Sequence, residues 1–382
     1  MAVTVWQDAL EIIAQESGLE PAEIIETDDM EFARLGINHI LATAILSHLR
    51  GPRGEPLPRD IFDQKRTVGA FRRFYETSIH LETSPITPIL APKRAQLKRE
   101  KSFTVPLSIV LQNSPASSRH TVFLLPDGSG SAMAYANLPP VHPTVCVVGM
   151  NSPYLRDANS YRCSVENLAS QWVQEIYRRQ PRGPYIVGGW SAGGYYSYEV
   201  AQRLLQDGHV VDKLILIDSP CRTVFESLSM EVVNYLSKHN LMGNWGSQGL
   251  PDWLVQHFRS TLAAVGKYRP RPLHSVGEME TYIIWSRDGV LEHDALVESG
   301  LDMSIKVSRF LLEGKDDLGP NGWDELLPSK DIAIATQSGT HFTMINKPHV
   351  AQMSDLLRDA VTGITTDRLS QWQRVRKDEQ GK

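Results

Sequence analysis

Residues 184–205 read PYIVGGWSAGGYYSYEVAQRLL, and this stretch decides the fold. Its first part is a short apolar run typical of a buried strand, and its second part has the apolar spacing of a helix. Between them, residues 189–193 read GWSAG and fit the pattern Gly-x-Ser-x-Gly. That pattern places a serine on a strained turn, with glycines where the helix passes close to the strand. The stretch predicts an α/β protein with Ser191 as nucleophile, against the alternative of a tight turn with an incidental serine.

Further strand-like runs flank this stretch on both sides. They are residues 121–126 (TVFLLP), 145–150 (VCVVGM), 213–218 (KLILID), 281–285 (TYIIW) and 331–335 (DIAIA). Because helical segments such as 166–179 separate several of them, we expect a parallel sheet covered by helices on both faces. The segment from Cys221 to about Arg271 is poor in strands and contains apolar helical pieces. We interpret it as a lid over a substrate chamber or as an ordinary helical insertion.

The base and acid that would activate the serine can be placed by their position after strands. A serine hydroxyl needs a base, and the base needs an orienting acid. Asp218 ends the run KLILID and His341 follows the run DIAIATQ, so both are expected at the same edge of the sheet as Ser191. The alternative acid is Asp288, which follows TYIIW, and the alternative base is His349. The predicted triad is Ser191, Asp218 and His341.

An oxyanion hole requires two backbone N–H groups near the serine. One is predicted at Ala192, where the dipole of the following helix also favours negative charge. The other is predicted in the loop 126–131 (PDGSGS), at Asp127 or, next, at Gly128. The loop can also be interpreted as a plain glycine-rich turn.

The first 78 residues have a different pattern. Helices are predicted after Thr4, from about Asn38 to Leu49, at Ile61-Phe62, and from Val68 to Tyr75 with Thr67 as its cap. They predict a small four-helix bundle. Residues 79–117, rich in proline, are predicted to be a linker, 118–366 the α/β domain, and 367–382 a disordered tail.

Composition excludes several classes of protein. The 382 residues carry a net charge of −5, which does not suggest nucleic-acid or membrane binding. The three cysteines form no CxxC pair, so neither a disulfide framework nor a zinc site is expected. No secretory signal and no apolar run of about 20 residues is present. We expect a cytoplasmic protein without a metal or redox cofactor.

The second domain resembles the thioesterase domains of fungal non-reducing polyketide synthases. The matching motifs, dispersed over about 120–345, are LLPDGSGSAMAY, GMNSP, GGWSAGG, LILIDSP, GPNGWDELL and GTHF. The resemblance implies an α/β-hydrolase fold with a helical lid. It also implies an acyl thioester on the acyl carrier domain of a polyketide synthase as substrate, with transfer of the acyl group to Ser191.

The first domain resembles an acyl carrier protein in ETDDMEFARLGIN and LPRDIFDQKRTVGAFRRFYE. The family's Asp-Ser-Leu is replaced by Asn38-His39-Ile40, so the serine that carries phosphopantetheine is absent. Ser47, two turns further on, does not occupy the matching position. Residues 38–53 also contain no acidic residue. These departures indicate a pseudo-carrier, against the alternative of a working carrier changed at His39.

A pseudo-carrier followed by a thioesterase resembles stand-alone fungal proteins that act in trans on a non-reducing polyketide synthase. The resemblance implies hydrolytic release of 2,4-dihydroxy-6-alkylbenzoic acids, of the olivetolic acid type. Two alternatives stay open: a Claisen or lactone-forming cyclase with the same triad, and a docking or scaffold protein whose pseudo-carrier domain is the main functional part. The alkyl chain length, the partner synthase and the oligomeric state do not follow from the sequence.

Overall fold

The structure is a computed structural model. The chain forms two compact units, Met1–Val105 and Pro106–Lys382. In the second unit the structure describes residues 106–376 except 156, 243–251, 274–278, 316 and 328–330. In the first unit it describes 5–17, 21–25, 28–32, 49–52, 54–58 and 60–77, together with the single positions 35, 37, 42, 45 and 46. Each unit is considered by itself.

The first unit is helical in its described part. Its helices are α1 (Val5–Ser17), α2 (Pro21–Ile24), α4 (Ile61–Gln64) and α5 (Val68–Thr77). The hydroxyl of Thr67 accepts a hydrogen bond from the N–H of Ala70 at 3.2 Å, as a residue that caps α5 should. Stacked and edge-on aromatic rings fill the core, namely Trp6, Phe32, Phe62, Phe71 and Tyr75. The predicted helix from Asn38 lies mostly outside the described residues.

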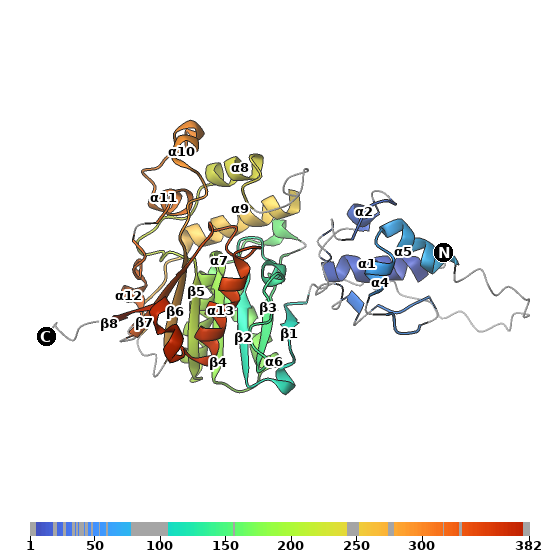
Figure 1. The fold of residues 1–382 in the computed structure, drawn as a ribbon, viewed down its shortest axis with the longest axis horizontal. Coiled ribbons are helices and arrows are strands. Elements are labelled where there is room, and N and C mark those ends of the chain that lie inside the picture. The colour runs from blue at the N-terminus through green and yellow to red at the C-terminus, as the bar shows by residue number, and fades with distance from the viewer. Residues whose placement is uncertain are drawn as a thin grey trace, which may run out of the picture. The chain divides into compact units, whose positions relative to one another are not determined.

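The second unit is built on one eight-stranded sheet in the order β1-β3-β2-β4-β5-β6-β7-β8 (Figure 1). The strands are β1 (Ser108–Gln112), β2 (His120–Leu125), β3 (Val145–Met150), β4 (Tyr185–Trp190), β5 (Val211–Ile217), β6 (Glu280–Ser286), β7 (Asp331–Gln337) and β8 (Trp372–Arg376). Strands β2 to β7 pair in parallel, and the two edge strands are antiparallel to their neighbours. The six predicted strands therefore form the parallel centre of the sheet.

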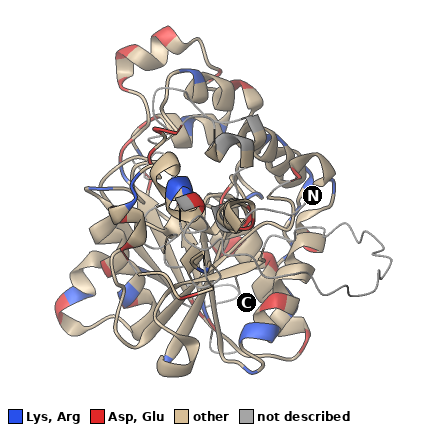
Figure 2. Ribbon diagram, turned by 90° about the vertical axis from the view of Figure 1, so that its right-hand side faces the viewer, with Lys and Arg blue, Asp and Glu red and all other residues tan. Residues whose placement is uncertain are grey.

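Helices cover both faces of this sheet. On one face α6 (Val165–Arg179) and α7 (Ala192–Gln206) share a core with alternate residues of the strands, among them Phe123, Val187 and Leu214. The next residues along each strand face the other side, where α13 (Val350–Thr362) crosses the sheet (Figure 1). Lys, Arg, Asp and Glu lie mostly on helices and loops, and the strands are nearly free of them (Figure 2). This burial on both faces explains the continuous apolar runs in the sequence.

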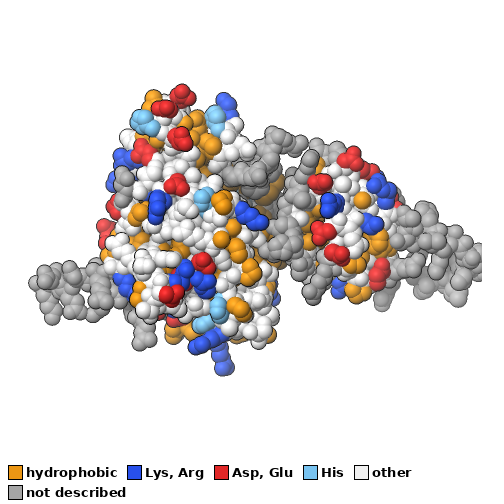
Figure 3. Space-filling view, viewed as in Figure 1, with side chains coloured by type: hydrophobic (Ala, Val, Ile, Leu, Met, Phe, Trp, Pro, Cys, Tyr) orange, Lys and Arg blue, Asp and Glu red, His pale blue; other side chains and the backbone are white. Residues whose placement is uncertain are grey.

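Inserted helices stand above the carboxyl edge of the strands (Figure 1). They are α8 (Met230–Lys238) and α9 (Asp252–Lys267) between β5 and β6, and α10 (His293–Ser299) and α11 (Lys306–Leu312) between β6 and β7. The short helix α12 (Trp323–Leu326), which follows α11, lies beside the sheet and packs into its core (Figure 1). On the face drawn in Figure 3, acidic and basic side chains of the described residues are interspersed. That face has no large patch of one charge.

Two predicted boundaries are wrong. Residues 79–117 were expected to be a linker, yet β1 and a 3-10 helix (Pro115–Ser117) belong to the second unit. The tail 367–382 was expected to be disordered, yet a 3-10 helix (Thr366–Gln371) leads into β8. Both strands lie at edges of the sheet, where one side of the strand stays exposed and polar residues are common, so neither has a long apolar run. Trp372 is buried against the ring of Tyr282 at 5.4 Å and anchors β8.

Candidate active site

Ser191 lies on a sharp turn between β4 and α7. Its backbone angles, φ 58° and ψ −123°, lie in a region that residues with a side chain rarely occupy. The approach of strand and helix depends on glycine, because a Cβ at Gly189 would lie 2.4 Å from the carbonyl carbon of Gly193. A Cβ at Gly193 would lie 2.5 Å from the carbonyl oxygen of Leu125. These distances are below normal contact, so the two flanking glycines of the motif are a steric requirement.

The turn lies at the point in the sheet where the order of the strands reverses along the chain. The chain passes from β2 to β3 on one side and then to β4 on the other, which opens a crevice at the carboxyl ends of β2 and β4. The hydroxyl of Tyr135 spans this crevice. It donates to the carbonyl oxygen of Leu125 at 2.6 Å and accepts from the N–H of Trp190 at 2.8 Å. This bridge fixes the strand end that carries Ser191.

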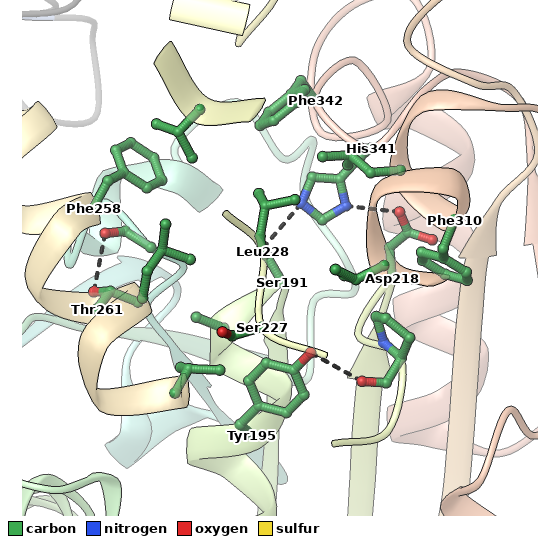
Figure 4. A pocket seen from close by; sticks show the side chains of 18 of the residues that line it. Ser191, Tyr195, Asp218, Ser227, Leu228, Phe258, Thr261, Phe310, His341 and Phe342 are labelled. Atoms are coloured by element: carbon green, nitrogen blue, oxygen red, sulfur yellow. Dashed lines mark hydrogen bonds and ion pairs between the residues drawn. The ribbon is translucent and has the colours of Figure 1, made fainter. Parts of the chain in front are cut away.

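The structure brings Ser191, His341 and Asp218 together in one chain of hydrogen bonds (Figure 4). The distance from His341 Nε2 to Ser191 Oγ is 2.9 Å, and the distance from His341 Nδ1 to Asp218 Oδ2 is 2.8 Å. The residues follow β4, β7 and β5, in agreement with the predicted positions. A Ser-His-acid chain of this geometry can pass the hydroxyl proton to the imidazole as the oxygen attacks a carbonyl.

Asp218 is fully buried and has several partners besides His341. Its Oδ1 accepts from the N–H of Ser286 at 2.9 Å and its Oδ2 from the Ser286 hydroxyl at 2.8 Å. Lys315 Nζ lies 2.8 Å from Oδ1 and 3.1 Å from Oδ2. Burial by itself would raise the pKa of Asp218, but the charge of Lys315 and the bonds from His341 outweigh burial and hold this pKa well below its usual range. The carboxyl group is therefore ionised.

Sequence reasoning missed Ser286 and Lys315. Both reach the site only through the tertiary fold, since Lys315 is 97 positions from Asp218 and lies in the charged stretch EGKDD after α11. A charged stretch of this kind is typical of a solvent-exposed loop. Nothing in its spacing marks one lysine as buried.

The alternative acid and base have other places. Asp288 Oδ2 accepts from the N–H of Gly339 at 2.7 Å, and the N–H of Asp288 donates to the carbonyl of Gly339 at 3.1 Å. It thereby ties β6 to the loop that carries His341. His349 Nδ1 lies 2.8 Å from the hydroxyl of Ser338, in a hydrogen bond at the exposed edge of the same loop. Neither residue contacts Ser191.

The predicted oxyanion residues border the same crevice. Ala192 begins α7 and lines the cavity beside Ser191. Asp127 follows β2, is buried, and accepts a short hydrogen bond from the hydroxyl of Ser129. Burial raises the pKa of Asp127 to about 6, although the bond from Ser129 opposes the rise.

The lid helix α9 holds the loop after Asp127. The carbonyl oxygen of Gly128 accepts from His257 Nδ1 at 3.0 Å and from the hydroxyl of Thr261 at 3.2 Å. His257 is buried, and burial lowers its pKa to about 4, so its ring is neutral at neutral pH. A Cβ at Gly130 would lie 2.3 Å from that ring. The loop and α9 are thus fitted to each other.

A mostly apolar cavity opens above Ser191 (Figure 4). It encloses about 710 Å³, including open solvent at its mouth. Apolar side chains from the inserted helices and the loops beside them line most of it, among them Leu228, Phe258, Leu262, Val265, Phe310 and Phe342. The lid interpretation of the inserted segment is thereby favoured, because α9 contributes directly to the wall. Such a chamber suits an acyl group with an apolar part.

The remaining residues singled out in the sequence belong to the first unit. His39 and Ser47 are outside the residues that the structure describes. Within the described ranges, no group of three or more His, Cys, Asp or Glu side chains is placed to hold a metal ion. No described helix is both long and apolar enough to cross a bilayer.

Comparison with known proteins decides the family. The family described as thioesterase domain matches residues 120–357, which is more than half of the chain. The chain belongs to the thioesterase family. The non-reducing polyketide synthase Preu8 of Preussia isomera is 32% identical to this thioesterase over an alignment of 376 positions, which covers 92% of this chain and 17% of the synthase. The non-reducing polyketide synthase terA of Aspergillus terreus is 34% identical, over 91% of this chain and 18% of the synthase.

The thioesterase thus spans less than a fifth of the length of these relatives. Among solved structures, the four-domain nonribosomal peptide synthetase holo-AB3403, bound to AMP and glycine, matches 88% of this chain and 25% of its own. The TM-score is 0.54 at 17% identity, which supports the fold alone. The fold is the α/β-hydrolase fold of thioesterases, and the chain carries a thioesterase domain of the serine hydrolase type.

Proposed function

We propose that this thioesterase acts in trans and hydrolyses the thioester of an aromatic polyketide on the acyl carrier domain of a partner non-reducing polyketide synthase. The product would be a free 2,4-dihydroxy-6-alkylbenzoic acid. The observation that carries the proposal is the hydrogen-bonded chain of Ser191, His341 and Asp218 at the floor of an apolar cavity. The likeness to non-reducing polyketide synthases supports the substrate class.

In the first half of the reaction, Ser191 Oγ attacks the thioester carbon while His341 Nε2 takes its proton. The C–S bond then breaks, and the departing sulfur of the carrier's arm receives the proton from His341 Nε2. Asp218 accepts the Nδ1–H of His341, which fixes the tautomer and stabilises the charged imidazole. The acyl group is left as an ester on Ser191.

In the second half, water attacks the ester. His341 takes a proton from the water and returns it to Ser191 Oγ as the C–O bond breaks, which releases the carboxylic acid and restores the enzyme. The N–H groups of Ala192 and Asp127 would stabilise the negative oxygen of both tetrahedral intermediates. Removal of one such donor typically costs about 10²–10³-fold in kcat.

We further propose that the first unit is a pseudo-carrier that docks on the synthase and carries no substrate. The replacement of the family's serine by His39 supports this, because imidazole provides no hydroxyl for the phosphodiester to the arm. Incubation of the full chain with a phosphopantetheinyl transferase and coenzyme A should leave its intact mass unchanged. A mass increase by one phosphopantetheine would show a working carrier.

Hydrolysis is tested with a defined substrate, the N-acetylcysteamine thioester of 2,4-dihydroxy-6-pentylbenzoic acid. The wild-type chain should release thiol and the free acid in equal amounts, as measured by a thiol reagent and by mass spectrometry. The Ser191→Ala variant should fold and release neither. Equal release by both proteins would remove Ser191 from the reaction. Because this substrate has no internal nucleophile that could close a ring, the cyclase alternative is tested by identifying the product formed with a synthase.

The trans-acting role needs a second experiment. A non-reducing synthase that lacks its own releasing domain is incubated with its substrates and with either protein. Product that depends on intact Ser191 supports release in trans. Equal product with the Ser191→Ala variant supports the docking alternative, in which the first unit is the main functional part.

A further inference from the structure

A buried cation lies against the acid of the proposed triad. Lys315 Nζ contacts both carboxylate oxygens of Asp218, at 2.8 and 3.1 Å, and its side chain is only 4% exposed. The reaction steps described above need no lysine. A lysine is almost never buried unless it is paired, so its place calls for a function that involves its partner.

Surrounding groups hold the ammonium in a fixed position. It donates to the carbonyl oxygen of Ser286 at 3.1 Å and forms a short hydrogen bond with the hydroxyl of the same residue. It also lies 4.2 Å above the ring of Phe310, a cation–π distance. Ser286 in turn donates twice to Asp218. Lysine, serine and aspartate therefore form one closed network, in which the carboxylate has little freedom to rotate.

The charges that face this network come from four elements. Asp218 follows β5, Asp288 follows β6, His341 follows β7, and Lys315 follows α11. Burial holds the pKa of Lys315 below its usual value, because the charge of Asp218 and, to a lesser extent, that of Asp288 oppose the effect of burial only in part. Because Asp218 is the carboxylate in direct contact, the lysine and Asp218 together form a nearly neutral pair.

A neutralised carboxylate changes the behaviour of the histidine beside it. In a Ser-His-Asp chain the ionised aspartate stabilises the imidazolium and so favours protonation of the histidine. A cation bound to the far side of the carboxylate opposes this effect. We infer that Lys315 is a positioning residue that clamps Asp218 toward His341 and offsets part of the stabilisation that the carboxylate gives to the imidazolium. The inference rests on the proposed triad.

The expected effect follows from distance. The path from Lys315 Nζ through Asp218 Oδ2 to His341 Nδ1 consists of contacts of 3.1 and 2.8 Å. A unit charge at about 6 Å, in an effective dielectric of about 20, shifts a neighbouring titration by up to about two pH units. Removal of the lysine charge should therefore move the acid limb of the pH profile toward higher pH by that amount.

The test is the pH dependence of kcat/KM for p-nitrophenyl hexanoate, which requires the triad but not the polyketide substrate. Lys315→Met removes the charge and should move the acid limb toward higher pH by up to about two pH units. Lys315→Arg keeps the charge and should leave the limb near its wild-type position. Lys213→Met is the matched control, because Lys213 is another buried lysine. Its Nζ lies 3.3 Å from Glu280 Oε1, and the pair is remote from the site. It should not move the limb.

A purely structural role predicts a different pattern, in which Lys315→Met lowers kcat and thermal stability but leaves the limb in place. That result in a folded variant would overturn the inference. Should Lys315→Met fail to fold, Lys315→Gln, which keeps a hydrogen-bond donor without the charge, provides the same comparison. Failure of the thioester assay together with a shifted limb in the ester assay would reject the proposed substrate and leave the inference standing.

Discussion

The strained turn at Ser191 predicts an unusual result for stability. The residue has φ 58° and ψ −123°, a region that glycine enters freely and other residues enter at a cost of about 1–3 kcal/mol. Ser191→Gly removes this cost and adds the backbone entropy penalty of glycine, about 0.5–1 kcal/mol. Both Ser191→Gly and Ser191→Ala lose the hydrogen bond to His341, so their difference isolates the backbone.

Ser191→Gly should therefore be more stable than Ser191→Ala by about 1 kcal/mol, the balance of strain relief and entropy. For a unit of this size that corresponds to a rise in Tm of about 2–4 °C. The assay is differential scanning calorimetry, supported by urea unfolding with fixed buffer and protein concentration. Both variants should be inactive toward the thioester.

The matched control is Ser118, whose φ of −104° and ψ of 148° are ordinary extended values. Here the sign should reverse, because glycine brings only its entropy penalty, and Ser118→Gly should be less stable than Ser118→Ala. If Ser191→Ala proves as stable as Ser191→Gly, or more so, then the turn stores no strain and the argument from backbone geometry fails.

Further predictions concern groups around the site. The pKa of Asp127 rises on folding to about 6, so ionisation in the folded state costs stability progressively as pH rises from about 4 through 6. In urea unfolding, Asp127→Asn should be more stable than wild type by up to about 3 kcal/mol above pH 7, and the two proteins should be equally stable near pH 4. Equal stability of the two proteins at both pH values would contradict the burial argument. Asp288→Ala loses the acceptor for the N–H of Gly339 and should lower kcat about tenfold, whereas Asp288→Asn, which retains a carbonyl acceptor, should keep most activity. His257→Ala leaves the carbonyl of Gly128 with one donor fewer and should lower kcat more than it raises KM. His257→Asn should restore part of kcat. An unchanged kcat in His257→Ala would show that this contact of α9 does not position the oxyanion loop.

The features that the sequence predicted correctly are those set by neighbours along the chain. The turn at Ser191 follows from a strand, two glycines and a helix within 22 residues, and each parallel strand has its own apolar run. The positions of Asp218 and His341 follow from the rule that parallel strands end at one edge of the sheet. These inferences need only local pattern and a known order of elements.

The features that it missed depend on contacts between distant segments. Lys315 is buried only because the loop after α11 folds over the end of β5, which no local pattern records. Strand β8 has the composition of an exposed tail and gains its order from pairing with β7. His257 is one histidine on an amphipathic helix, and its contact with Gly128 appears only when the lid is in place.

Strand β8 has a consequence for the behaviour of the protein in solution. It pairs with β7 along the register Asp331↔Arg376 to Ala335↔Trp372 and so occupies the outer edge of the strand that leads to His341. Without it, the backbone groups of an apolar strand would face solvent, which is a template for pairing with another chain. We expect the five residues of β8, with arginine at 374, to protect this edge against such pairing, because a charged edge strand disfavours it. Removal of β8 should therefore lower solubility before it lowers activity, which light scattering and an ester assay on the same sample would show.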